Sequence, residues 1–463
     1  MNETVNMNGN KMGTAPVNQL LLSMAWPMIL SMLVGACYNV VDSLFISHYS
    51  ENALTAVSLA FSIQTLIVAI GTGVGVGANA LLATHLGRNE KEKADLTAKH
   101  SLIVGLLFYL IVMLFGVFLT ERFFLLQTTD SEIVAMGTSY LRIVCIFSFC
   151  QIFELVLEKL LQATGHTSCT MITQMVGAIV NIVLDPILIF GLFGLPKMGA
   201  AGAAIATVTG QFIAMALGVL FNLTRNKEID FSFKNFKFDS VYLVDICKLG
   251  VPTIIMNSMT SVMSFGVNKI LLSYTSTAAA VFGAYFKIQT FVYMAVFGLN
   301  TALLSIVAFN KGAGNPDRIK KVIRLAGVYS AIIGLIGTAI MFLLPEQLIG
   351  AFSPSESMLE IGTIAFRILS LTFIFGSVTV MVSYALQGFA RGVSSLVVSA
   401  LRQVILLLPL AVLFSAILGL EGVWIGYLVA EVISFAVAVV IIKIVTSKEC
   451  SALIHEEEVA CCH

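Results

Sequence analysis

The sequence predicts an all-α polytopic membrane protein with twelve transmembrane helices in two parallel six-helix repeats. Only 11% of its 463 residues are charged and its mean hydropathy is +0.95, whereas a soluble protein carries about 25% charged residues. Apolar segments of about 20 residues or more recur along the chain, and each can cross a hydrocarbon core of about 30 Å. The second half also repeats polar positions of the first half at a fixed offset.

The expected spans are 19–46, 53–80, 97–120, 133–162, 168–194, 200–223, 244–273, 278–308, 318–344, 356–388, 394–418 and 421–446. The longest polar interruption lies between the sixth and seventh spans and divides the chain almost in half. We therefore expect an N-terminal tail (1–18), an N-lobe (19–223), a linker (224–243), a C-lobe (244–446) and a C-terminal tail (447–463).

The distribution of basic residues predicts the orientation of the spans. Loops after odd-numbered spans contain only Arg122 and Lys197, whereas most other lysines and arginines flank the even-numbered loops and the two ends of the chain. Cytoplasmic loops carry the excess of Lys and Arg, so the sequence predicts a multi-pass protein of the cytoplasmic membrane with both termini and the linker in the cytoplasm. The formal net charge is zero, and no basic domain suggests a nucleic-acid partner.

An internal repeat links the two halves at an offset of 225 residues. Pro27 corresponds to Pro252, and Phe61, Ile63, Gln64 and Thr65 correspond to Phe286, Ile288, Gln289 and Thr290. Each half has an even number of spans, so both enter the membrane from the same side and form parallel repeats. Transporters built in this way hold substrate between the halves, so the repeat favours a carrier over a channel or a membrane enzyme.

Asp185 is the most costly residue in the apolar spans. An acid at the bilayer centre costs about 2.5–3.5 kcal/mol on insertion scales, so it indicates a functional site. Asn181 lies one helical turn earlier on the same face. Pro186 lacks a backbone donor, which leaves a carbonyl without its helical partner. A carboxylate, an amide and a freed carbonyl together predict a proton or cation site.

Asp42 is the second candidate for this site. The first and fifth spans both run outward, and their lengths place Asp42 and Asp185 in the outer half of the bilayer. Two carboxylates in one pocket of low dielectric repel each other, so one of them should hold a proton. With the oxygen of Asn181 they could equally bind Na⁺, since hard cations prefer oxygen ligands. The structural alternatives are an interfacial acid at Asp42 and an Asp185 bonded to Asn181 or a tyrosine.

Further polar residues are candidates for a substrate cavity. Glu154 and Glu158 lie one turn apart near the cytoplasmic end of the fourth span, where they could attract a cationic substrate, although Glu158 could instead pair with Lys159. The remaining candidates are Tyr38 and Asn39 in the first span, Tyr140 and Met175, which could line an aromatic cavity, and Lys287 in the eighth span, which we expect to be near-buried.

The glycine-rich run at 71–77 resembles a phosphate loop, but no strand precedes it. We interpret Gly71 with Gly75, and Gly73 with Gly77, as small-residue pairs for close helix packing. The sequence contains no HExxH, GxSxG or nucleotide-binding motif and no ATPase domain. We therefore predict no enzymatic activity and no cofactor, and the energy source must be an ion gradient of H⁺ or Na⁺.

The sequence resembles the multidrug and toxic compound extrusion (MATE) transporters, in particular the DinF-like bacterial and archaeal branch. The matching segments cover most of the chain: AWPMIL and YNVVDSLFIS (25–47), LLQATGHT (160–167), NIVLDPILIFG (181–191), MGAAGAAIATVTGQ (198–211) and LQGFARG (386–392). The resemblance implies a V-shaped pair of six-helix lobes that exports drugs in exchange for H⁺ or Na⁺. By motif, its N-lobe cation site corresponds to Asp42, Asn181 and Asp185, with Thr207 as a further contributor.

This resemblance predicts a monomeric antiporter for drug-like cationic or amphipathic compounds. The alternative is a flippase for a lipid-linked oligosaccharide or another amphiphile, since the wider superfamily includes such proteins. A flippase prefers a cationic central cavity, for which Lys287 and Arg402 give slight support. The acids of the first half favour the antiporter.

Overall fold

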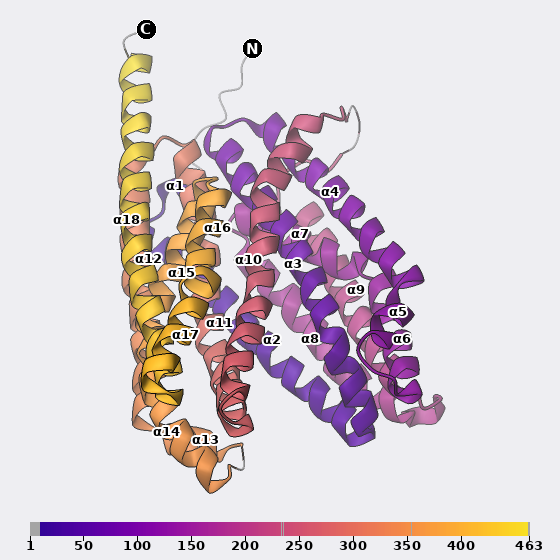
Figure 1. Ribbon diagram of the computed structural model, residues 1–463. Helices are drawn as coiled ribbons and strands as arrows, with labels where there is room; N and C mark the ends of the chain where they lie inside the picture. The colour runs from indigo at the N-terminus through magenta and orange to yellow at the C-terminus, as the bar shows by residue number, and fades with distance from the viewer. Residues whose placement is uncertain (1–9, 233, 235, 353, 462–463) are drawn as a thin grey trace. The chain divides into compact units, whose positions relative to one another are not determined.

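The computed structural model describes residues 10–232, 234, 236–352 and 354–461, and these form helices joined by short loops (Figure 1). They contain no strand, so the predicted all-α fold is confirmed. The helices are α1 (Lys11–Thr14), α2 (Val17–Tyr49), α3 (Glu51–Gly87), α4 (Lys91–Phe118), α5 (Thr120–Leu125), α6 (Ser131–Ile146), α7 (Phe149–Ala163), α8 (Thr167–Phe190), η2 (Leu192–Gly194), α9 (Ala200–Thr224), α10 (Ser240–Leu272), α11 (Ser276–Gly312), α12 (Pro316–Leu343), α13 (Pro345–Gly350), α14 (Glu356–Ser370), α15 (Thr372–Gly388), α16 (Gly392–Ala400), η3 (Leu401–Ile405), α17 (Leu407–Leu418) and α18 (Leu420–Cys461).

Within these residues, ten helices are long and apolar enough to cross a membrane, and two bent helix pairs bring the total to as many as twelve. The pairs are α6 with α7, bent by 43°, and α14 with α15, bent by 44°. Carbonyls at the bends find side-chain donors: Tyr109 donates to the oxygen of Ile146, and Thr338 donates to that of Ser370. Such bonds satisfy backbone groups that lose their helical partners.

The helix boundaries reproduce the internal repeat. Helices α3, α4 and α5 begin and end 225 residues before α11, α12 and α13, respectively. The offset found in polar side chains therefore extends to the lengths of whole helices. The structure therefore reproduces the predicted repeat in the bounds of these three helix pairs.

Residue contacts divide the chain into two compact units that share two helices. The first unit contains Leu30–Ile254, and the second contains the part of α2 up to Ile29 together with the chain from Ile255 onward. The crossings fall just after Pro27 in α2 and Pro252 in α10. The expected N-lobe and C-lobe follow the order of the chain, whereas these units each include part of α2 and part of α10. The bounds of the expected lobes therefore stay a prediction.

Local packing explains why each of these two helices is shared. Within the second unit, Tyr329 donates a hydrogen bond of 2.6 Å to Asn18 in the first part of α2. Within the first unit, the beginning of α10 lies directly on the glycines of α3. A Cβ at Gly77 would lie 2.5 Å from the carbonyl oxygen of Ile246, and one at Gly73 would lie 2.7 Å from that of Gly250.

The other two glycines of this run face a different helix. A Cβ at Gly71 would lie 2.8 Å from the side chain of Leu155 in α7, and one at Gly75 would lie 2.6 Å from that of Lys159. The two predicted glycine pairs therefore form two separate contact faces on α3. Their interpretation as close-packing positions is confirmed.

The linker between α9 and α10 is anchored on α4 through His100. This side chain is fully buried, and its ring lies 5.0 Å from that of Phe236, 5.8 Å from that of Phe238 and 5.2 Å from that of Tyr242. The backbone N–H of Asp239 donates to its Nε2 over 3.0 Å. These contacts hold the beginning of α10 against α4.

Candidate ion and substrate sites

Helix α8 carries Asn181 and Asp185 on one buried face. It continues through Pro186 without interruption, and Asp185 is fully buried. Asn181 donates a hydrogen bond of 3.3 Å from its Nδ2 to the Oγ1 of Thr207 in α9. The two helices can approach this closely because Gly177 and Gly210 face each other. The structure therefore brings together three of the four predicted coupling residues on α8 and α9.

Asp42 of α2 completes the group. Its carboxyl lies close enough to the carboxyl of Asp185 for the two groups to interact electrostatically. Two ionised carboxylates are both acceptors, so a bond between them requires a proton on one. Neither carboxylate oxygen of Asp185 has a hydrogen-bond partner among the described residues, so the structural alternative in which Asp185 is bonded to Asn181 or a tyrosine does not occur.

Four oxygens of this group are buried and receive no hydrogen bond from the described residues: Asp42 Oδ1, Asn181 Oδ1 and both carboxylate oxygens of Asp185. A buried polar atom without a partner costs about 1–3 kcal/mol, and a charged one costs more. Oxygens are the atoms that protons and hard cations bind. Chemically, this group can take up a proton or ligate a monovalent cation.

Tyr140 of α6 lies beside the acids. It is almost fully buried, and Gln64 of α3 donates a hydrogen bond of 2.6 Å from its Nε2 to the tyrosine hydroxyl. Tyr140 also lies close enough to Tyr38, Asp42 and Asp185 for electrostatic interaction. Gln64 was not among the predicted site residues, although the repeat had singled it out through its counterpart Gln289.

Glu158 of α7 is buried in a second polar group. Its carboxylate accepts hydrogen bonds from Thr173 Oγ1 over 2.8 Å and from Gln174 Nε2 over 2.7 Å, both on α8. Ser31 of α2 in turn bonds to Gln174. Lys159, the alternative partner considered above, donates to Gln162 over 2.8 Å instead. Thr173 and Gln174 were missed because their contact depends on how α7 and α8 pack.

Glu154 lies one turn earlier on the same helix and is also buried. Its partner is Gln151, which donates over 3.4 Å and itself accepts from Gln211 of α9 over 2.6 Å. The two glutamates therefore belong to separate hydrogen-bonding groups. Both face polar side chains rather than lipid.

The other predicted cavity residues have less defined surroundings. Met175 and Tyr38 are half-buried, and the side chain of Asn39 lies outside the described part of the structure. Lys287 belongs to the second unit and is exposed, with its Nζ 5.8 Å from the ring centroid of Phe352. The expectation that Lys287 is near-buried is therefore wrong, because its side chain reaches past the helix surface toward an aromatic ring.

The second unit contains a different polar core. Arg402 lies in the π-helical turn η3 and donates from its Nε to Glu431 of α18 over 2.8 Å. Its Nη2 donates to the hydroxyl of Tyr293 over 2.7 Å. Here the deep acid is already paired with a cation from the chain itself. The sequence analysis named Arg402 but not its partner Glu431.

Comparison with known proteins places these sites in a family context. The MatE family model matches residues 27–187 and 252–413. Curated relatives include a multidrug export protein, MepA of Staphylococcus aureus, which is 22% identical over 435 residues, covering 94% of this chain and 95% of the relative. A FAD transporter of Shewanella oneidensis is 25% identical over 411 residues, covering 88% of this chain and 90% of that protein.

Solved structures agree with the family match. One is an outward-facing multidrug resistance MATE transporter of the MOP superfamily, with a TM-score of 0.90 and 25% identity, covering 96% of this chain and 99% of the other. Another is a MOP superfamily transporter from Pyrococcus furiosus, described as having a binding pocket of reversed polarity, with a TM-score of 0.89 and 25% identity over 95% and 98% of the chains. The family match spans both repeats, and this chain therefore belongs to the MatE family of membrane transporters.

Proposed function

We propose that this protein is a secondary active multidrug efflux antiporter of the cytoplasmic membrane that exports cationic or amphipathic organic compounds in exchange for H⁺ or Na⁺ by alternating access. The observation that carries the proposal is the group formed by Asp42, Asn181, Asp185 and Thr207, with its four buried oxygens that lack donors. The name of the S. aureus relative supports the direction and the class of substrate.

The coupling ion would bind within the first unit. A proton shared by Asp42 and Asp185 would satisfy two of the unpartnered oxygens, and a Na⁺ ion would use the same atoms as ligands. Moving one charge through 100 mV yields about 2.3 kcal/mol. At about 1.4 kcal/mol per tenfold, one coupled charge could support a substrate gradient of roughly 40-fold.

The substrate would be attracted by Glu158 and Glu154. A cation that reaches Glu158 would replace or join the donors Thr173 and Gln174, which already hold the carboxylate in position. Tyr38, Asn39, Tyr140 and Met175 remain candidates for the wall of the cavity. An organic cation gains from carboxylates and aromatic faces together.

Flux measurements in proteoliposomes test this proposal. The purified protein is reconstituted, and uptake of a fluorescent organic cation is followed under an imposed pH gradient or an imposed Na⁺ gradient, applied separately. Transport driven by one or both gradients supports the proposal, and its absence under both contradicts it. The substrate panel includes FAD, because the S. oneidensis relative carries that name. A protein that moves only FAD would require a different substrate class.

A further inference from the structure

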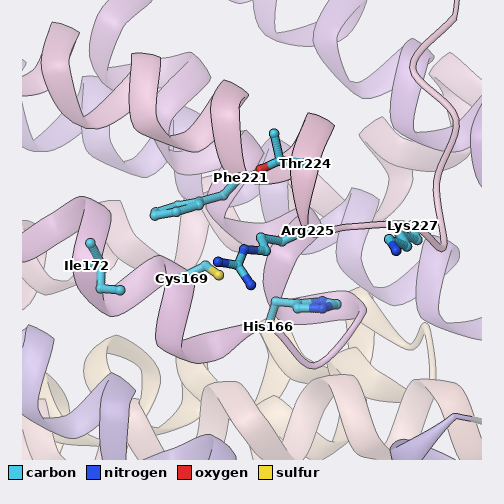
Figure 2. A pocket seen from close by; sticks show the side chains of 7 residues that line it. All are labelled: His166, Cys169, Ile172, Phe221, Thr224, Arg225 and Lys227. Atoms are coloured by element: carbon cyan, nitrogen blue, oxygen red, sulfur yellow. The ribbon is translucent and has the colours of Figure 1, made fainter.

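A cavity of about 540 Å³ opens at one end of the first unit, away from the acids of the ion site. It is lined by residues from the beginning of α8, the end of α9 and the turns next to them: His166, Cys169, Ile172, Phe221, Thr224, Arg225 and Lys227 (Figure 2). His166 immediately precedes α8, and Arg225 immediately follows α9. The positive-inside rule predicts that this end faces the cytoplasm.

The charge of the lining is entirely positive. Arg225 and Lys227 contribute two cations, and none of the lining residues is acidic. Both side chains are exposed, and the structure shows no ion pair for either within the described residues. Figure 2 shows the guanidinium of Arg225 beside Cys169, directed into the cavity rather than away from it. The two cations of this lining therefore favour a ligand that carries negative charge.

The other wall of the cavity is apolar. Ile172 is 42% exposed, and Phe221 is half-buried next to Leu220, which is 50% exposed. These side chains lie on helices that are long and apolar enough to cross a membrane, so an acyl chain can pack against this face. The cavity thus presents cations and an apolar surface side by side. A free anion would interact with the cations but not with the apolar surface.

We propose that this cavity binds the headgroup of an anionic phospholipid from the cytoplasmic leaflet. The phosphate would lie against Arg225 and Lys227, and an acyl chain would follow Ile172 and Phe221. Basic pockets between transmembrane helices on the cytoplasmic side suit such headgroups. The amides at the start of α8 add the positive end of its helix dipole. Because α8 also carries Asp185, the lipid would brace the helix that holds the ion site.

Lipid binding to the full-length protein tests the assignment. Phosphatidylglycerol is titrated into the purified protein in detergent, and bound copies are counted by native mass spectrometry, with phosphatidylcholine as the uncharged comparison. The variant Arg225→Gln with Lys227→Gln should bind phosphatidylglycerol about 30-fold more weakly, since each cation contributes roughly fivefold near an anionic surface. Binding of phosphatidylcholine should not change.

A matched control separates a site from general charge attraction. Lys321→Gln with Arg324→Gln removes one lysine and one arginine, both exposed, from the start of α12. This variant should bind phosphatidylglycerol as the unmodified protein does. The proposal would be overturned if the Arg225→Gln and Lys227→Gln variant bound phosphatidylglycerol as tightly as the unmodified protein. It would also be overturned if the control variant lost as much binding as that variant. Inorganic phosphate that displaces the lipid at equal concentration would overturn the lipid assignment. Monodisperse elution of both variants confirms that they are folded.

Discussion

Arg402 donates a hydrogen bond of 2.8 Å from its Nε to the Oε1 of Glu431 in the second unit, where Glu431 is buried and Arg402 is 13% exposed. The deep acid of this unit is thereby neutralised by a residue of the chain. At the repeat offset of 225, Asn181 and Asp185 correspond to Leu406 and Leu410, and the extra residue of the π turn shifts them to Leu407 and Ala411. The second unit thus has no counterpart of the ion site at these positions.

Breaking this pair should destabilise the protein strongly. Glu431→Gln leaves the mostly buried guanidinium of Arg402 without its counterion, and the loss of one partner of a buried pair costs about 3–5 kcal/mol. Thermal unfolding in detergent, compared with the exposed-pair variant Asp245→Asn, measures the effect. The double variant Arg402→Met with Glu431→Gln should recover much of the loss. A double variant less stable than Glu431→Gln would contradict this account.

Asp185→Asn should abolish ion-driven transport without loss of stability. The carboxylate oxygens of Asp185 are buried without donors, so replacing the acid by a neutral group of the same shape removes a desolvation cost. We expect an unchanged or higher melting temperature together with flux reduced to background. Flux in proteoliposomes and thermal unfolding are measured on the same preparation. Asp317→Asn, which removes an acid that is 98% exposed, serves as the control and should transport normally.

Glu158→Gln should weaken the recognition of cations specifically. The carboxylate lies in hydrogen bonds from Thr173 and Gln174, and an amide in its place retains the shape but not the charge. A charged hydrogen bond contributes about 1.5 kcal/mol or more, so the apparent KM for an organic cation should rise about tenfold. An uncharged amphiphile should be transported as before. A parallel rise in KM for both substrates would indicate a structural role instead.

Gly77→Ala should destabilise the first unit, whereas Gly105→Ala should not. A Cβ at Gly77 would lie 2.5 Å from the backbone oxygen of Ile246, so α3 and α10 would have to separate. Overpacking of this kind costs about 1–3 kcal/mol. The Cβ at Gly105 would meet its nearest neighbour at 3.5 Å, an ordinary contact, and alanine favours the helix there. Melting temperatures of the two variants compare them directly, and equal values would contradict the proposed contact.

Much of the architecture could be read from the chain because the bilayer imposes it. Helices must satisfy their own backbone in lipid, so apolar segment lengths predict the spans. The offset of 225 predicts matched helices, and α3 with α11 confirm it. Asp185 could be recognised for the same reason, since an acid in an apolar span is too costly to be incidental. The glycine pairs were readable because small residues recur one turn apart.

The partners of these residues depend on packing that no local pattern records. Asn181 bonds to Thr207 rather than to Asp185, since α9 approaches α8 at Gly210. Arg402 meets Glu431 across 29 positions of the chain, and Glu158 meets Gln174 across a helix pair. The crossing of α2 and α10 between units also follows from contacts rather than from hydropathy. Hydropathy acts on each span separately, whereas hydrogen bonds between side chains depend on distances that arise only after the helices have packed.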